Sequence, residues 1–118
     1  MQNNSPKPVP EPPAQLANVF FALGDATRLR LVAVLCAGGL FSITQLTASS
    51  DITRQAVTKH LRVLAQAGLV HDVRTGRERL WQLDPAPLDE ARRSLEQIGQ
   101  QWDQALGRLK AFVERNPR

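Results

Sequence analysis

The chain has 118 residues, a formal net charge of +4 and a single cysteine, Cys36. This length is that of one ordinary domain. One cysteine excludes an intramolecular disulfide and a thiolate metal cluster within one chain. No apolar stretch is long enough to cross a bilayer, and the N-terminus lacks the apolar region of a signal peptide, so we expect a cytoplasmic protein with no membrane contact.

Proline divides the sequence into two parts. Five of the eight prolines fall within the first thirteen residues, among polar neighbours. Such a segment cannot bury apolar surface or form regular hydrogen-bonded ladders. We therefore predict a disordered proline-rich tail over residues 1–13 and one folded domain over residues 14–118.

The positive charge is concentrated in one segment. Residues 53–80 hold six basic and two acidic side chains, whereas residues 1–52 and 81–118 each carry equal numbers of both. A local excess of this kind favours a polyanion as the partner.

Two amphipathic helices are expected at the start of the domain. The first ends at Gly24, and Asp25 or Thr27 caps the second, which Gly38 and Gly39 terminate. Their apolar positions are Leu16, Val19, Phe20 and Leu23 in the first helix and Leu29, Val32, Leu35 and Cys36 in the second.

The cysteine lies among apolar neighbours. We interpret Cys36 as a small buried hydrophobic residue. The alternative, a redox-sensing thiol, requires an exposed and activated sulfur and usually a second cysteine.

Capping signals define two further helices. Ser42 and Gln45 have the spacing of a capping box, which starts a short helix through about residue 48. Thr53 is the best N-cap for the next helix, and Gly68 supplies its left-handed stop. That helix carries two faces: an apolar stripe of Val57, Leu61 and Leu64, and a polar, basic face of Gln55, Thr58, Lys59 and Arg62.

A β-hairpin follows in "LVHDVRTGRERLWQLD". Two β-prone runs flank Arg74–Arg77, where Gly76 permits the positive φ of a tight turn. Trp81 and Leu83 lie on one side of the second strand and should anchor the hairpin to the core. Arginines stand at and near its tip.

The last segment predicts a long helix over residues 85–116, with Asp84 as N-cap and Pro85 in the first position. One heptad position holds Leu88, Leu95, Trp102 and Leu109, and the other holds Ala91, Ile98, Ala105 and Phe112. At 1.5 Å per residue such a helix is longer than a globule of ~100 residues is wide. Part of its apolar seam then lacks cover within one chain, and a second copy is the simplest cover.

Together these elements predict a mainly α protein with a small β-hairpin wing: a winged helix-turn-helix, dimeric through its N- and C-terminal helices. In this class a helix enters the major groove of DNA and short side chains near its start reach base edges. The expected DNA-binding residues are Thr53, Arg54, Gln55, Ala56, Thr58, Lys59, Arg62, Arg74, Arg77 and Arg79. The expected dimer interface contains Leu16, Val19, Phe20, Leu95, Ile98, Trp102, Ala105, Leu109 and Phe112.

Three segments also resemble the ArsR-type transcriptional repressors: "FALGDATRLRLVAVL", "RQAVTKHLRVLAQAGLV" and "RTGRERLWQLD". The resemblance spans roughly residues 14–116. It implies a dimeric winged-helix repressor that binds an imperfect palindrome in double-stranded promoter DNA, often that of its own gene. Ala26 departs from the proline common at this position in the family, which removes some stiffness at a helix start.

This sequence lacks the metal ligands that the resemblance would imply for a metal-responsive member. Metal-responsive members of the family carry a cysteine pair before the recognition helix, or Asp and His ligands on the C-terminal helix. Here "SITQLTASS" holds neither cysteine nor histidine, and His60 and His71 do not form a ligand spacing. The terminal "WDQALGRLKAFVE" resembles the members without an obvious metal site, so we expect no metal or other cofactor, and the sequence does not identify a small-molecule effector.

Three alternative functions were compared with the residues: the first is not expected, and the other two stay open. An enzyme is not expected, because there is no glycine-rich phosphate loop and no nucleophile–base–orienter set. A winged-helix protein-interaction module would present a neutral or acidic recognition face. A metal- or redox-responsive repressor would need a non-standard sensor site.

Overall fold

The computed structural model describes residues 14–115, and the predicted tail over residues 1–13 lies outside them. Five helices and three strands form this described part of the chain. They are α1 (Leu16–Leu23), α2 (Ala26–Leu35), β1 (Phe41–Ser42), α3 (Ile43–Ala48), α4 (Arg54–Gln66), β2 (Val70–Thr75), β3 (Glu78–Leu83) and α5 (Pro85–Arg115). Within the described range, no helix is both long and apolar enough to cross a bilayer.

The first two helices are joined by side chains as well as by the turn. Of the two predicted caps of α2, Asp25 is the one that the structure shows. Its carboxylate accepts hydrogen bonds from the backbone N–H groups of Thr27 and Arg28, both at 3.0 Å. Arg28 reaches back to α1, where its guanidinium donates to the carbonyls of Phe21 and Ala22. These carbonyls are among those that a helix C-terminus leaves without an intrahelical partner. Arg28 therefore supplies hydrogen-bond donors to two carbonyls at the C-terminal end of α1.

The predicted starts of α3 and α4 are confirmed. Ser42 accepts from the Gln45 N–H at 3.1 Å while the Gln45 side chain accepts from the Ser42 N–H at 2.9 Å, which completes the capping box. Thr53 Oγ1 accepts from the Ala56 N–H at 3.1 Å. Each cap satisfies donors that a helix start would leave unpaired.

The end of α4 is also as predicted. Gly68 has φ +76° and donates its N–H to the Ala65 carbonyl, and the Leu69 N–H donates to the Leu64 carbonyl. This pair of bonds is the Schellman motif, in which a left-handed glycine lets the chain reverse. Leu69 is fully buried against the last turn and begins the path into β2.

The hairpin is confirmed, but it is part of a larger sheet. Strands β2 and β3 pair antiparallel, with Arg74 opposite Arg79 and the turn at Gly76, whose φ is +63°. The sequence prediction missed β1, which pairs with β3 through Phe41 and Ser42 and makes a three-stranded sheet of order β1-β3-β2. A strand of two residues has no periodicity to detect, and only the pairing with β3 defines it.

The core lies between α1, α2, α3, α4 and the base of the sheet. Its fully buried side chains include Leu31, Leu35, Leu46, Leu61 and Leu64, with Trp81 from β3 only 3% exposed. Trp81 therefore anchors the wing, as expected, and Leu83 packs against the same core.

Two predictions about α2 are wrong. Leu29 is 53% exposed, and Leu31 takes the core position instead. Cys36 is exposed rather than buried, because α2 ends at Leu35 and Cys36 is its C-cap, one residue past the last buried turn. Helical spacing alone allowed two neighbouring faces, and packing against α4 and the sheet selected one.

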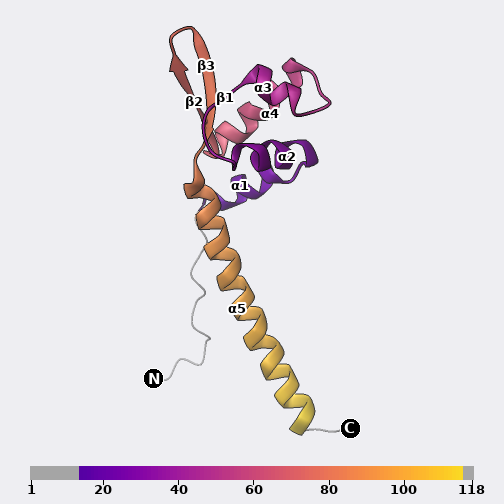
Figure 1. Ribbon diagram of the computed structural model, residues 1–118. Coiled ribbons are helices and arrows are strands. Elements are labelled where there is room, and N and C mark those ends of the chain that lie inside the picture. Colours follow the sequence, from indigo (N-terminus) through magenta and orange to yellow (C-terminus); the bar gives the residue numbers. More distant parts are fainter. Residues whose placement is uncertain (1–13, 116–118) are drawn as a thin grey trace.

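Helix α5 leaves the winged-helix part of the molecule and extends away from it, opposite to the hairpin (Figure 1). The molecule measures 68 × 36 × 21 Å with a radius of gyration of 20.7 Å. A globular chain of ~100 residues has a radius of gyration of about 13 Å. The excess is due to α5, whose 31 residues span about 46 Å.

Candidate nucleic-acid interface

The polar face of α4 is open to solvent, as its sequence predicted. Gln55, Lys59 and Arg62 are exposed, and Ala56 and Thr58 are half-buried. The opposite side of the helix carries Val57, Leu61 and Leu64, all fully buried. Burial of this stripe fixes the rotation of α4 about its axis, so the face with Gln55 must point outward.

The wing supplies three arginines with different surroundings. Arg74 and Arg77 are exposed near the turn. Arg79 is held across the hairpin: its Nε donates to Asp72 Oδ2 at 2.8 Å, and its guanidinium lies 5.0 Å from the centroid of the Trp81 ring. That hydrogen bond from Arg79 holds the pKa of Asp72 below its ordinary value. Arg79 therefore has a counter-ion inside the wing.

The start of α4 and the first residues of β3, next to the hairpin turn, line one hollow of about 390 Å³. Arg54 from α4, Thr44 from α3, and Arg77 and Arg79 from the wing line it, together with Glu78. Arg54 Nη1 donates to Thr44 Oγ1 at 3.1 Å, which orients its guanidinium beside α3. The sequence did not predict this contact between Arg54 and Thr44, because nothing in the spacing of the two residues indicates it.

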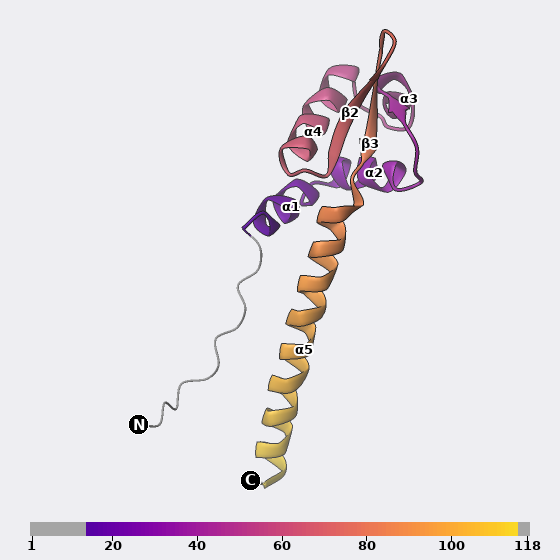
Figure 2. The ribbon, with the colours of Figure 1, turned by 90° about the vertical axis from the view of Figure 1, so that its left-hand side faces the viewer.

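Figure 2 shows that α4 and the hairpin lie at the same end of the molecule, on the far side from the end of α5. Both elements carry exposed cationic side chains: Arg54, Lys59 and Arg62 on α4, and Arg74 and Arg77 on the wing. Arg54, Lys59, Arg62 and Arg77 enter none of the ion pairs found among residues 14–115. We call Arg54, Gln55, Lys59, Arg62, Arg74 and Arg77 the basic surface.

One side-chain contact joins α4 to the start of α2. His60 Nδ1 lies 3.9 Å from Asp25 Oδ2, the same carboxylate that caps α2. The backbone hydrogen bond from Arg28 is the largest cause that keeps the pKa of Asp25 below its ordinary value. The negative charge at the start of α2 also complements the helix dipole. His60 therefore faces the scaffold and not the basic surface.

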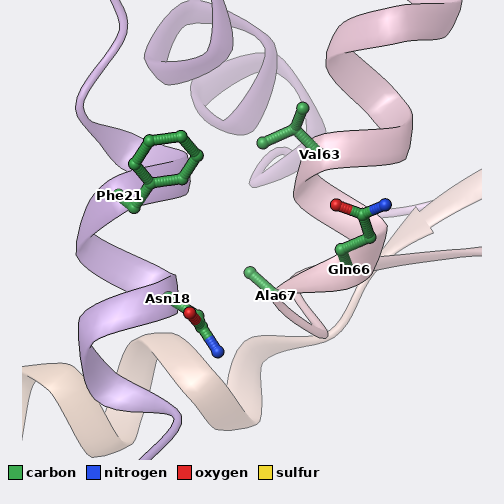
Figure 3. A pocket seen from close by; sticks show the side chains of 5 residues that line it. All are labelled: Asn18, Phe21, Val63, Gln66 and Ala67. Carbon is green, nitrogen blue, oxygen red and sulfur yellow. The ribbon is translucent and has the colours of Figure 1, made fainter.

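A second hollow, of about 270 Å³, lies between α1 and the C-terminal half of α4. Figure 3 shows Phe21 and Val63 on its two walls, with Asn18, Gln66 and Ala67 below them. None of these five side chains is ionisable. The hollow is separate from the basic surface and offers no charged group to a nucleic acid.

The residues expected at a dimer interface fall into two environments. Leu16 and Val19 are 7% and 2% exposed and belong to the core of their own chain, whereas Phe20 is 38% exposed. On α5, Leu95, Ile98, Trp102, Leu109 and Phe112 are 43–63% exposed, and Ala105 is half-buried. The heptad missed two further exposed apolar residues beside it, Leu106 and Val113.

The histidines and the cysteine do not come together. Among residues 14–115 there is no group of three His, Cys, Asp or Glu side chains with the geometry to hold a metal ion. His60 contacts Asp25, His71 is exposed on β2, and Cys36 lies at the end of α2.

The arrangement defines the class of protein. Helices α3 and α4 form a helix-turn-helix, β2 and β3 form the wing beside it, and α4 presents an exposed polar and basic face. This is a winged helix-turn-helix, the architecture that places its second helix in the major groove of DNA.

Comparison with known proteins agrees with this class. A family described as a helix-turn-helix domain matches residues 23–73. The HTH-type transcriptional regulator Rv2034 of Mycobacterium tuberculosis is 39% identical over 85 residues, which cover 72% of this chain and 76% of that protein. An ArsR-like transcriptional regulator from Rhodococcus sp. RHA1 is 38% identical, with a TM-score of 0.79 over 86% of this chain and 93% of that one. The transcriptional repressor BigR from Xylella fastidiosa is 28% identical, with a TM-score of 0.57 over 66% of this chain and 76% of that one.

The chain belongs to the ArsR-like family of helix-turn-helix transcriptional regulators. It is a DNA-binding regulator of transcription, as the sequence predicted.

Proposed function

We propose that this regulator is a repressor that binds an imperfect palindrome in a promoter as a homodimer, one winged helix-turn-helix to each half-site. Residues 14–118 act as one DNA-binding unit, and α5 supplies its dimerisation surface. Binding of such an operator blocks transcription of the adjacent gene.

Helix α4 reads the bases in this proposal. Gln55 forms a bidentate pair with adenine, and Lys59 and Arg62 contact guanine or phosphate. Ala56 meets a thymine methyl group, and Thr53 and Thr58 contribute short polar contacts near the helix start. Gln55, Ala56, Thr58 and Lys59 lie in the first two turns of α4, which supports the assignment, since that part of a recognition helix approaches base edges.

The remaining arginines contact the sugar–phosphate backbone of the DNA in this proposal. Arg54, beside Thr44, and Arg74 and Arg77, on the wing, follow the flanking phosphates or enter the minor groove. Arg79 was expected to act in the same way. Its pairing with Asp72 favours a different role, in which it stiffens the wing and contributes less to phosphate binding.

One observation supports DNA binding most directly. Helix α4 and the wing lie at the same end of the molecule (Figure 2), and their residues Arg54, Lys59, Arg62 and Arg77 have no carboxylate partner among the described ion pairs. Cations in this state exchange bound anions for phosphates at little cost. A winged-helix protein-interaction module would not require them.

Fluorescence anisotropy tests the proposal. The protein is titrated against a duplex carrying the inverted repeat from its own promoter region and against random DNA of the same length, at two salt concentrations. We expect tighter binding to the repeat by at least about 10³-fold at physiological salt. Equal, weak binding to both duplexes would contradict sequence-specific regulation.

The homodimer rests on the exposed seam of α5. Trp102, which is 63% exposed, lies at its centre, and burying such a ring contributes about 2–4 kcal/mol. Trp102→Glu should give monomers that keep the winged-helix fold, because Trp102 lies outside the core of its own chain. Sedimentation velocity with circular dichroism measures both properties. A wild-type monomer at micromolar concentration would overturn the homodimer.

A further inference from the structure

The hollow of about 270 Å³ between α1 and the C-terminal half of α4 has one aromatic wall, Phe21. Its other wall is Val63, and Asn18, Gln66 and Ala67 lie below them (Figure 3). We call it the α1–α4 hollow. It lies apart from the basic surface, yet two of its lining residues belong to α4, the second helix of the helix-turn-helix.

The ring of Phe21 is an exposed apolar surface that is held in position. Its side chain is 70% exposed, the largest value among the large apolar side chains of residues 14–115. The Arg28 guanidinium lies over the ring, 5.5 Å from its centroid, and donates to the carbonyls of Ala22 at 2.6 Å and Phe21 at 3.2 Å. These hydrogen bonds fix the cation beside the ring. An aromatic wall that is already ordered lowers the entropy cost of binding a second ring.

Two side-chain amides supply the polar groups of the α1–α4 hollow. Asn18 Nδ2 donates to Gln15 Oε1 at 3.3 Å, which leaves Asn18 Oδ1 as an acceptor. The Gln66 side chain is exposed and enters none of the side-chain hydrogen bonds found in the described part of the chain. Its amide offers both donors and an acceptor. A ligand group that both donates and accepts, as a carboxamide does, complements this pair.

The charge and size of the hollow restrict the ligand further. None of the five lining side chains is ionisable, so an ionised ligand would lose hydration without gaining a counter-ion. Pockets for drug-sized ligands measure about 300–1,000 Å³, and the α1–α4 hollow lies just below this range. The complementary molecule is therefore small and uncharged, with a flat ring and an amide.

From these features we infer that the α1–α4 hollow is an effector site for a small uncharged aromatic amide. The ring of the ligand lies between Phe21 and Val63. Its carbonyl accepts from Gln66 Nε2, and its amide N–H donates to Asn18 Oδ1. Such a ligand joins α1 to α4 next to Arg62 of the basic surface, so its binding is linked to that of DNA. The inference rests on the DNA binding by α4 proposed above and is independent of the homodimer.

Nuclear magnetic resonance of the full chain tests the site, with benzamide as the probe. We expect shifts of the Val63 methyl and Gln66 side-chain amide signals, with a dissociation constant of about 1 mM or lower. The Val73 methyl signals, on the wing, should not move. Benzoate has the ring with a charge and acetamide has the amide without a ring, so both should bind at least about tenfold more weakly. Equal binding of either would overturn the ligand class.

Two variants test the lining residues. Phe21→Ala should weaken benzamide binding by about tenfold, and Gln66→Ala by about threefold, because one loses the aromatic wall and the other a hydrogen bond. Both side chains are exposed, so the variants keep the fold, which circular dichroism verifies. Leu29→Ala, which removes another exposed apolar side chain on α2, is the control and should bind benzamide as the wild type does. Benzamide binding that is absent, or indifferent to both variants, would overturn the site.

The effector role is tested by fluorescence anisotropy with the inverted-repeat duplex. Saturating benzamide should change the dissociation constant for DNA by at least about fivefold, and DNA should change the constant for benzamide by the same factor. Acetamide at the same concentration is the control. Benzamide binding without any change in DNA affinity would overturn the effector role and leave DNA binding as proposed. A protein that binds benzamide but no DNA would overturn the proposed function and, with it, the effector role.

Discussion

Arg79 on β3 donates from Nε to the Asp72 carboxylate on β2 at 2.8 Å, and its guanidinium lies against the Trp81 ring. The wing thus contains one arginine that is neutralised within the hairpin and another, Arg77, that has no carboxylate partner among the described ion pairs. Residues of the same type, two positions apart, are therefore expected to behave differently towards DNA.

Arg77→Ala should weaken binding to operator and random DNA to a similar degree. Each phosphate contact contributes about −0.9 to the slope of log K against log salt, so its loss should flatten the slope by about one for each contact removed. Arg79→Ala should change the slope less, because its charge is already paired. Arg93→Ala, which removes a cation paired to Asp89 on α5, is the control. Equal slopes for wild type and Arg77→Ala would show that this arginine is only a solvated surface charge.

Gln55→Ala should cost about 1–3 kcal/mol of binding free energy on the operator and much less on random DNA. The reason is that a bidentate contact to a base edge carries sequence information, which a phosphate contact does not. Gln66→Ala, at the other end of the same helix, provides the matched control. Isothermal titration on both duplexes measures the difference. If Gln55→Ala weakens both duplexes equally, this face of α4 does not read bases.

The Asp72–Arg79 pair makes the wing sensitive to acid. The pKa of Asp72 is lowered from 3.8 in the folded state, so the ionised form is favoured by folding. Its contribution to stability is present above about pH 4 and is lost as the pH falls through the lowered pKa. The difference in unfolding midpoint between wild type and Asp72→Asn should therefore shrink as the pH is reduced from 6 to 2. Asp51→Asn, which removes an exposed carboxylate without an ion pair among the described residues, should show no such trend.

Gly68→Ala should destabilise the chain by about 1–2 kcal/mol, because the left-handed φ of +76° is strained for a residue with a Cβ atom. The position also ends α4, so strain there disturbs the path from recognition helix to wing. Gly107→Ala, in open space on α5, should be neutral or stabilising by up to about 1 kcal/mol. Urea denaturation of both variants gives the comparison. A Gly68→Ala variant as stable as the wild type would mean that the turn adopts another conformation.

Zinc, cadmium and arsenite should leave the affinity for DNA unchanged. The chain has one cysteine, Cys36, and no histidine on α5, so it has neither of the ligand sets that the family resemblance implies for metal-responsive members. Each metal is titrated into the protein–DNA complex and anisotropy is recorded. Stoichiometric release of DNA by any of them would reveal a sensor site, and one shared between subunits would be the first to examine.

The sequence determined the elements whose causes are local. Ser42 with Gln45, Thr53 and Gly68 define the ends of α3 and α4 through hydrogen bonds that span five residues or fewer, so these ends were predicted correctly. The same holds for the turn at Gly76 and for the start of α5 after Asp84. The exposed face of α4 also followed, because its apolar stripe is complete within one helix.

Only the tertiary structure decided the features that depend on which surfaces meet. Strand β1 exists through its pairing with β3, and Leu31 rather than Leu29 is buried because α4 and the sheet cover that side of α2. Leu16 and Val19 were predicted at the dimer interface but belong to the core of their own chain. Phe20 remains partly exposed, at the apolar groove between α1 and α5. The sequence alone suggested that Arg79 is a free cation. The pairing of β2 with β3 brings it to Asp72, with which it forms an ion pair. Each of these outcomes depends on contacts between segments distant in the chain, and no local propensity encodes such contacts.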